Sequence, residues 1–231
     1  MTITQKRLNA LDCVLGLDCS KYQKDINWEE AKAGGIEFAF IKITEGTTYS
    51  EDELYNVQAR AAEAKEQGVK IGYYHFARPG NEKDAVKDAK DEIANIAKHL
   101  THLPQANFPI VIDLESYAKD IVWDDKIKHM VIYLDTLITE LRNKYKMSPI
   151  IYSYSSFLNS NLKKEKIPEY VKNGNILWLA AYVKNPGLSL PVLPIGWDSW
   201  KIWQFTDKGQ ISGYSGDIDL NVMKKDLFNI Y

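Results

Sequence analysis

Residues 109–115 have the sequence Pro-Ile-Val-Ile-Asp-Leu-Glu, an apolar run rich in β-branched side chains that ends in two carboxylates. Such a nearly continuous hydrophobic run predicts a β-strand, Pro109–Glu115, that is covered on both faces. Amphipathic stretches on either side, from Asn81 to about His102 and from about Asp124 to Tyr145, predict two longer helices. A strand between two such helices is typical of a parallel sheet with crossover helices, and it indicates an α/β fold.

The same alternation of apolar runs and helical stretches extends along the chain in both directions. Asn27 can cap a short helix that stops at Gly34–Gly35, and a capping box of Ser50 and Glu53 predicts a helix that ends at Gly68. The other predicted strands are Val14–Asp18, Glu37–Ile43, Val69–Phe76, Pro149–Tyr154, Ile176–Tyr182 and Trp200–Phe205. About seven or eight β–α units fit a single TIM-like barrel. We therefore expect one barrel domain, residues 14–231, after an N-terminal extension, residues 1–13.

The last quarter of the chain departs from this pattern. Lys208-Gly209-Gln210 and Tyr214-Ser215-Gly216-Asp217 have the composition of hairpin turns rather than of a helix between two strands. We therefore expect an irregular barrel, and not a regular eightfold repeat of strand and helix.

Composition and charge exclude several classes of protein. The net charge of −2 and the pI near 6.1 lack the basic footprint of a general nucleic-acid binder. The N-terminal segment has neither a continuous apolar core nor a small-residue cleavage site, so we expect no signal peptide, and we expect no membrane insertion. Cys13 and Cys19 would lie about 20 Å apart on a strand, which is too far for a disulfide, and we expect free thiols.

Asp113 and Glu115 carry the strongest local chemical signal. In a barrel of this kind the carboxyl ends of the strands converge on one face, where active sites lie. A spacing of two places both side chains on one face of a strand, with Cα atoms about 6.6 Å apart. Two carboxylates this close in a partly dry site cannot both ionise at low cost, so one pKa rises, as acid-catalysed cleavage of a glycosidic bond requires. Taken alone, however, Asp-x-Glu more often caps a neighbouring helix or pairs with lysines.

Carboxylates after other predicted strands weaken that structural interpretation. Asp18 ends the run Val-Leu-Gly-Leu, although an N-cap or turn residue explains it equally well. Turn chemistry accounts for Asp217, whereas Asp219 lies between two apolar residues. His75 is interpreted as a hydrogen-bonded structural residue. The sequence contains no Gly-rich phosphate loop, Ser-His-Asp set or His-Glu-x-x-His motif, and we expect neither a metal ion nor another cofactor.

Eight segments, spread in order over roughly residues 14–222, resemble the bacterial and phage muramidases of glycoside hydrolase family twenty-five. They are GLDCSKYQ (16–23), FIKITEGTTY (40–49), GYYHFAR (72–78), IVIDLE (110–115), PIIYSY (149–154), LWLAAY (177–182), WQF (203–205) and DIDLN (217–221). Each segment by itself is a weak signal, but eight in register are highly specific. One departure is Cys19, where the family more often has a β-branched or small residue.

The resemblance implies an irregular, flattened β/α barrel that hydrolyses the β-1,4 bond from N-acetylmuramic acid to N-acetylglucosamine in bacterial peptidoglycan. By this analogy Glu115 is the general acid, and Asp113 is a partner carboxylate that stabilises charge or orients the substrate's N-acetyl group for internal attack. Asp18 and Asp219 would complete the acidic floor, with Asp217 as the alternative to Asp219. The positions that match sugar-contacting residues of the family are Lys42, Tyr49, Phe76, Tyr154, Trp178 and Tyr182.

The family also sets expectations about partners and location. Bacterial peptidoglycan is the expected partner of a monomeric enzyme that is made in the cytoplasm and acts on the cell wall after release of the phage type. Many relatives carry a wall-binding module, and none is evident in this sequence. The alternatives are a carbohydrate-binding barrel without turnover, a glycosidase of chitin or another N-acetylated glycan, and a metal-dependent hydrolase. The retaining, inverting or substrate-assisted course stays open.

Overall fold

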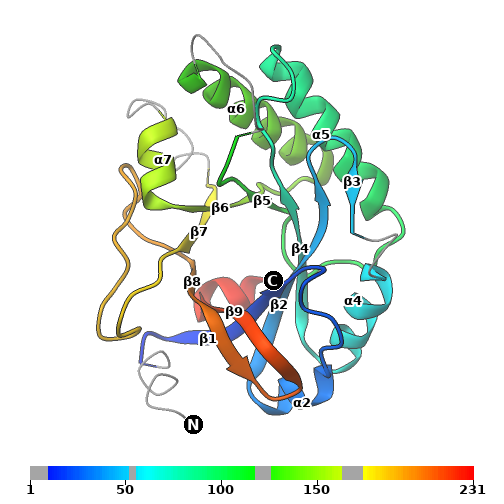
Figure 1. Cartoon of the computed structure of the whole chain (residues 1–231), viewed down its shortest axis with the longest axis vertical. Helices are drawn as coiled ribbons and strands as arrows, with labels where there is room; N and C mark the ends of the chain where they lie inside the picture. Colours follow the sequence, from blue (N-terminus) through cyan, green and yellow to red (C-terminus); the bar gives the residue numbers. More distant parts are fainter. Residues whose placement is uncertain (1–9, 52–55, 118–125, 163–173) are drawn as a thin grey trace.

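The computed structural model describes residues 10–51, 56–117, 126–162 and 174–231, and one sheet closes on itself at its centre (Figure 1). Its strands are β1 (Cys13–Cys19), β2 (Ile36–Glu45), β3 (Tyr49–Ser50), β4 (Lys70–Phe76), β5 (Val111–Asp113), β6 (Ile150–Tyr154), β7 (Ile176–Ala180), β8 (Ile202–Ile211) and β9 (Tyr214–Lys224). The helices are α2 (Trp28–Ala33), α4 (Val57–Glu66), α5 (Ala85–Leu100), α6 (Lys126–Tyr145), α7 (Ser155–Asn161) and α9 (Lys225–Ile230).

The sheet closes because β1 pairs with strands from both ends of the chain. Among the described strands, eight follow one another in the order β1-β9-β8-β7-β6-β5-β4-β2, and β2 pairs again with β1, while β3 extends the edge of β2. Neighbours around the ring are parallel except at β9, which is antiparallel to β8 and to β1. This arrangement confirms an α/β barrel of the TIM type whose last quarter is irregular.

A direct hairpin, β8–β9, replaces the last strand–helix unit. Its turn lies at Ser212 and Gly213, where Gly213 has a φ of 83°. The predicted turn at residues 208–210 is therefore wrong, since these residues continue β8, and residues 214–217 belong to β9. Gly209 serves packing instead of a turn, because a Cβ there would lie 2.3 Å from the side chain of Leu220.

Two helix starts differ from the prediction. Helix α4 begins after Asn56, whose side chain accepts a backbone hydrogen bond from the first turn, and not at a capping box of Ser50 and Glu53. Ser50 belongs to β3 and pairs with β2, and Glu53 lies outside the described residues. Helix α5 begins after Asp84, whose carboxylate accepts two N–H groups of the first turn, whereas the Asn81 side chain donates to a loop carbonyl. In both cases a residue nearer the helix provides the cap.

Two other helices follow the prediction closely. Asn27 caps α2 by accepting a hydrogen bond from the Glu30 N–H at 3.0 Å, and the helix ends before Gly34. Helix α6 ends at Tyr145 as predicted, while the predicted start near Asp124 lies outside the described residues. None of the helices that the structure describes is long and apolar enough to cross a membrane.

Alternate residues of the strands pack inside the barrel, and the residues between them face the helices. The interior cluster consists mainly of large side chains from successive strands: Phe38, Phe40, Tyr74, Val111, Ile150, Tyr152, Trp178, Ile202 and Met223, with Phe108 and Leu227. A second, larger cluster lies between the barrel and the helices. Because side chains alternate with a period of two, the residues two positions beyond these interior ones face inward at the open end of the barrel.

The interior has room for two phenylalanines of β2 only because the neighbouring strands carry glycine opposite them. Gly16 pairs with Phe38, and Gly72 pairs with Phe40. A Cβ at either glycine would lie 2.5 Å from the ring that faces it. Such a contact forces the ring or the backbone to move, so the barrel interior depends on these two glycines.

We expect Gly72→Ala to lower the free energy of unfolding by about 1–3 kcal/mol, because the added methyl group overpacks the interior against Phe40. Phe40→Leu should recover part of this loss in the double variant, since the smaller side chain makes room for the methyl group. Urea unfolding of the four proteins measures both effects. A Gly72→Ala protein within about 0.5 kcal/mol of the wild type would contradict this packing account.

Candidate functional site

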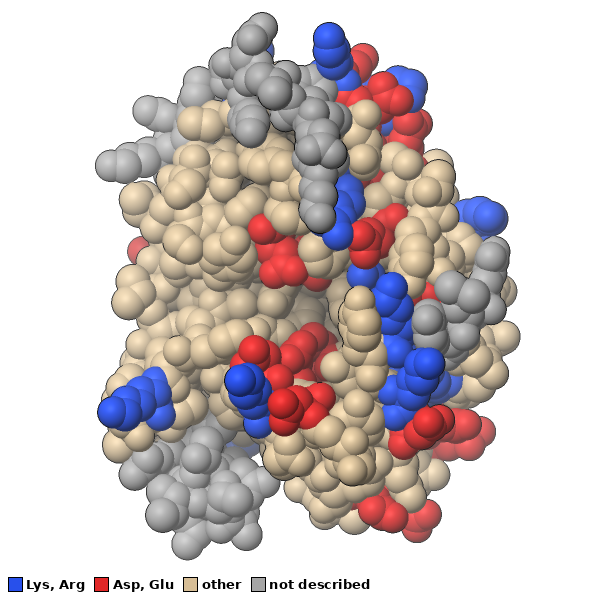
Figure 2. All heavy atoms as spheres, in the orientation of Figure 1, with Lys and Arg blue, Asp and Glu red and all other residues tan. Residues whose placement is uncertain are grey.

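A pocket of about 180 Å³ lies at the carboxyl ends of the barrel strands. On β2 and β5 the inward-facing residues are apolar in the barrel interior and polar at the carboxyl end. Phe40 is followed by Lys42 on β2, and Val111 is followed by Asp113 on β5. Acidic side chains gather around a hollow on the face shown in Figure 2. The residues that line the pocket are Asp18, Asp113, Glu115, Asp219, Ser20, Tyr22, Lys42, Tyr74, Phe76, Tyr152, Trp178 and Gln204.

Asp113 and Glu115 both face this pocket, as their spacing predicts. Asp113 is the last residue of β5 and is 6% exposed. Burial, and then the charge of Glu115, raises the pKa of Asp113 well above its ordinary value. The pKa of Glu115 is also raised, by burial and then by Asp18, and the nearby cations Arg78 and Lys42 oppose this rise. The two carboxyl groups therefore hold protons at a higher pH than free carboxylates do.

Asp18 and Asp219 face each other across the β1–β9 ladder. Burial raises the pKa of Asp18, although hydrogen bonds to its carboxylate partly offset this effect. Burial, and then Asp18, raises the pKa of Asp219 to about 8, and the two side chains are hydrogen-bonded to each other. A hydrogen bond between two carboxyl groups needs a proton on one of them, so the pair keeps that proton to a higher pH than two separate carboxyl groups would.

Of the two candidates on β9, only Asp219 lines the pocket. Asp217 is exposed, and its Oδ1 accepts a hydrogen bond from Gln210 Nε2 at 2.9 Å on the outside of the hairpin. Alternation does not separate these residues, because both have the same parity on the strand. Their positions along β9 distinguish them instead, because Asp219 pairs directly with Asp18.

Two amides that were not among the predicted site residues hold Asp18 in place. Gln204 Nε2 donates to Asp18 Oδ2 at 2.9 Å, and Asn221 Nδ2 donates to the same oxygen at 2.7 Å. Gln204 Oε1 in turn accepts the hydroxyls of Tyr152, at 2.9 Å, and Tyr182, at 2.8 Å. These hydrogen bonds fix the position of the Asp18 carboxylate. The clue for Asn221 was its position two residues beyond Asp219, on the same face of β9.

Lys42 and Phe76 form another part of the pocket wall. Lys42 Nζ lies 2.7 Å from Glu45 Oε2 and 3.9 Å from an oxygen of the buried Glu51. The same ammonium lies 4.9 Å from the ring centroid of Phe76 and 5.7 Å from that of Tyr49. Lys42 therefore presents a positive charge beside two aromatic rings, and Tyr49 lies next to the pocket without being part of its lining.

The remaining predicted sugar contacts separate into two groups. Tyr154 and Tyr182, which are 37% and 55% exposed, line an adjoining cavity of about 310 Å³ together with Glu115 and Tyr152. Trp178 is only 2% exposed, and its ring stacks on Phe40 at a centroid distance of 4.6 Å. Trp178 thus belongs to the floor of the pocket, where its Nε1 donates to an amide, and offers little ring surface for stacking on a sugar.

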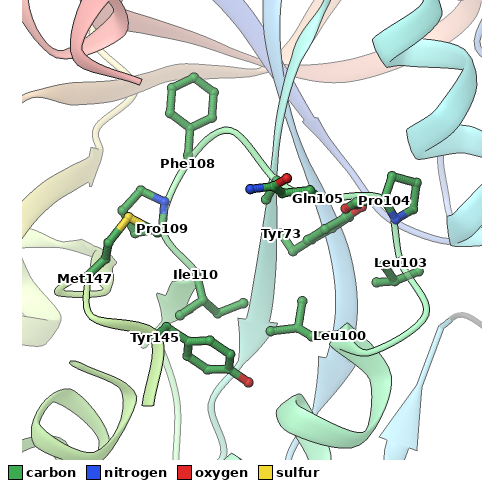
Figure 3. Close-up of a pocket in the computed structure, with 11 residues that line it drawn as sticks. Tyr73, Leu100, Leu103, Pro104, Gln105, Phe108, Pro109, Ile110, Tyr145 and Met147 are labelled. Atoms are coloured by element: carbon green, nitrogen blue, oxygen red, sulfur yellow. Dashed lines mark hydrogen bonds between the residues drawn. The ribbon is translucent and has the colours of Figure 1, made fainter. Parts of the chain in front are cut away.

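Other candidate sites are less suited to chemistry. A mostly apolar pocket of about 190 Å³ lies where the helices α5 and α6 end and the chain enters β5, between Tyr73, Phe108 and Tyr145 (Figure 3). His75 is fully buried between Thr44 and Glu92, which agrees with the predicted structural role. Within the described parts of the chain, no group of three or more His, Cys, Asp or Glu side chains is arranged to hold a metal ion.

Both the sequence and the fold of this chain are similar to those of known proteins. The family model of the glycosyl hydrolases family 25 matches residues 17–214. Lysozyme M1 of Streptomyces globisporus is 29% identical over 214 residues, which is 90% of this chain and 67% of that protein. A bacterial lysozyme from Streptomyces coelicolor superposes with a TM-score of 0.74 at 26% identity, over 91% of each chain. A family GH25 lysozyme from Aspergillus fumigatus gives 0.70 at 26% identity, over 94% of this chain and 98% of that one.

We expect the stability of the protein to fall as the pH rises from about 4 to about 8. The pKa of Asp219 is about 8 in the native chain and near its ordinary 3.8 when unfolded. Between these values Asp219 binds more protons in the native state than in the unfolded state. Its contribution to the free energy of unfolding is therefore complete at low pH and is lost as pH rises through the native pKa. Asp219→Asn should flatten this decline, measured by urea unfolding at about pH 5 and about pH 8.5.

Asp217→Asn is the matched control, because this exposed carboxylate lies outside the pocket on the same strand. It should leave the pH dependence of the wild type unchanged. An Asp219→Asn protein that loses stability with pH as steeply as the wild type would show that Asp219 holds no extra proton in the native state.

Proposed function

The chain belongs to glycosyl hydrolase family 25 and is a glycosidase of the lysozyme type, and we propose that it cleaves the β-1,4 bond from N-acetylmuramic acid to N-acetylglucosamine. One observation carries this proposal most directly: Glu115 lines both the acidic pocket and the adjoining tyrosine-lined cavity. A glycan that occupies both cavities places one glycosidic bond beside Glu115. Bacterial peptidoglycan is the substrate that this reaction requires.

Glu115 has the properties of the general acid. It is partly exposed, so it can reach the oxygen of the leaving sugar, and burial and Asp18 raise its pKa above the ordinary value of 4.5. A carboxylic acid whose pKa is raised keeps its proton to a higher pH and can transfer it to that oxygen as the bond breaks. Its neighbour Asp113 is nearly buried and lies deeper, which suits a group that stays in place and does not transfer the proton.

Asp113 supports the proposed orientation of the substrate's N-acetyl group. Its Oδ1 is buried and accepts no hydrogen bond from the described residues. A buried acceptor without a partner is unfavourable, and the amide N–H of an N-acetyl group entering the pocket would satisfy it. Held in this way, the acetyl oxygen can attack the anomeric carbon as the bond to the leaving sugar breaks, and water then opens the resulting ring to complete the hydrolysis. The Asp18–Asp219 pair lies in the same pocket, and a negative charge on it stabilises the oxocarbenium-like transition state.

Lys42 and the exposed aromatic residues support the choice of muramic acid. The lactyl group of muramic acid carries a carboxylate, and Lys42 offers an ammonium group on the wall of the pocket. Tyr154 and Tyr182 offer partly exposed rings for the apolar faces of the sugars on the other side of Glu115, and Phe76 does so beside Lys42. Chitin, the main alternative among N-acetylated glycans, has no carboxylate to meet Lys42.

The bond is identified by digesting purified peptidoglycan, reducing the new sugar ends with borohydride and analysing them by mass spectrometry. The proposal predicts new muramitol ends. Glucosaminitol ends would keep a glycosidase but contradict the proposed bond. Digestion of chitin oligomers in place of peptidoglycan would favour the alternative substrate, and no new reducing ends from either polymer would favour a carbohydrate-binding barrel without turnover.

We expect Glu115→Gln to lower turnover of peptidoglycan by at least ~10² while the protein stays folded, because the amide cannot donate an acidic proton. Asp113→Asn should lower turnover by a similar factor, since the orientation of the N-acetyl group depends on the carboxylate. Release of soluble muropeptides measures the rates, and circular dichroism checks the fold. Asp217→Asn should retain wild-type activity, and near-normal activity in Glu115→Gln would refute the assignment of the acid.

A further inference from the structure

Arg78 lies where the ends of two barrel strands meet, just after β4. Its guanidinium donates to Glu45 Oε1 from Nε at 2.8 Å and from Nη2 at 2.6 Å, and to Ser116 Oγ from Nη1 at 2.9 Å. Glu45 ends β2, and Ser116 is the residue directly after Glu115. A planar guanidinium holds several partners in a fixed geometry, which a lysine ammonium does not. Arg78 therefore ties the end of β2 to the segment that carries Glu115.

The backbone of Arg78 is fixed from behind by a buried carboxylate on α5. The Arg78 N–H donates to Glu92 Oε1 at 3.0 Å, and Glu92 is fully buried. Glu92 Oε2 also accepts the Tyr133 hydroxyl at 2.7 Å and lies 2.5 Å from His75 Nε2. Satisfied polar networks of this kind are rigid, because breaking them leaves buried groups without partners. The position of Arg78 is thus set by the helix layer as well as by its strand.

Arg78 is also the cation that lowers the pKa of Glu115 most. Burial and Asp18 raise the pKa of Glu115, and Arg78 lowers it more than Lys42 does. Lys42 also lowers the pKa of Asp113, which burial and the carboxylates of Glu115, Asp18 and Glu45 raise. A general acid works best when its pKa lies near the working pH, so an acid that burial has raised needs a cation to limit the rise.

We propose that Arg78 is a positioning residue of the glycosidase reaction, which orients the Glu115 carboxyl through Ser116 and keeps a positive charge beside it. The proposal rests on the proposed role of Glu115 as the acid. Arg78 acts through Glu115 and Ser116, and its ion pair with Glu45 keeps the guanidinium in place when no substrate is bound. Glu45 links it in turn to Lys42, so the cations on this wall form one connected group.

Glu115 is surrounded by ionisable groups from most of the strands that form the pocket. Besides Arg78, they are Asp18 of β1, Tyr22 after β1, Lys42 of β2, Tyr74 of β4, Asp113 of β5, Tyr152 and Tyr154 of β6, Tyr182 after β7 and Asp219 of β9, with Glu45 at the end of β2 paired to both cations. Their carboxyl groups titrate as a coupled set. A change at Arg78 should therefore appear as a shift of the alkaline limb of the pH–rate profile, which reports loss of the acid's proton.

The test compares pH profiles of kcat and kcat/KM on purified peptidoglycan for three variants with the wild type. Arg78→Gln should move the alkaline limb of kcat/KM upward by about 0.5–1 pH unit, because the cation that lowers the pKa of Glu115 is gone. Its kcat at the optimum should fall about 10-fold, with a smaller change in KM. Ser116→Ala should lower kcat several-fold without moving the limb. Arg78→Lys should bring the limb back towards its wild-type position.

Arg142→Gln is the matched control, since Arg142 on α6 makes a comparable contact, 2.9 Å from its Nε to Ser148 Oγ, away from the pocket residues. It should leave both profiles unchanged. If the alkaline limb of Arg78→Gln stays at the wild-type position, the proposal is overturned. Wild-type kcat in a folded Ser116→Ala protein also overturns it. The Ser116→Ala result decides the question if Arg78→Gln does not fold. If Glu115→Gln keeps its activity, the assignment of the acid fails instead, and the two failures are thereby distinguished.

Discussion

The antiparallel pairing of β9 with β1 is the contact on which the rest of the molecule depends. It closes the barrel, because β9 is the strand that joins β8 to β1, and its register sets Asp219 directly opposite Asp18. Two carboxyl groups held together in a buried site share a proton, and their charge reaches Glu115 and Asp113 across the pocket. One pairing therefore supplies both the closed fold and the electrostatic field of the site.

The apolar interior and the polar site are successive levels of one structure. The interior rings of β2 fit because glycines lie opposite them on the neighbouring strands, and the next inward positions of the same strands carry the pocket. Tyr152 and Trp178 belong to both levels: their rings pack in the interior, and their polar atoms hold the amides that bind Asp18. A site supported in this way needs little reorganisation when charge develops in the transition state.

Local patterns in the sequence predict some parts of this arrangement well and others poorly. Asp113 and Glu115 line one pocket, as their spacing of two predicts, although β5 ends at Asp113 and Glu115 follows in the loop; continuous apolar runs identify the buried strands. The capping box at Ser50 was wrong because pairing with β2 places that residue in β3, and local spacing carries no information on that pairing. The contacts of Asp18 with Asn221, and of Arg78 with Ser116, join residues far apart in the chain, so only the register of the closed sheet brings them together. Trp178 matched a sugar-contacting position, yet Phe40 covers its ring.

The chemistry proposed for this site depends on burial and neighbouring carboxylates, which keep a proton on Glu115 at a pH where a free glutamate has lost it. Its most direct test is a carbon-13 NMR titration of the side-chain carboxyl groups, in protein labelled at glutamate, from about pH 3 to about pH 9. The resonance of Glu115 is assigned by its absence in Glu115→Gln. We expect the pKa of Glu115 to lie above the ordinary value of 4.5. A midpoint at or below 4.5 would contradict it, because Glu115 would then be ionised near neutrality and could not serve as the acid.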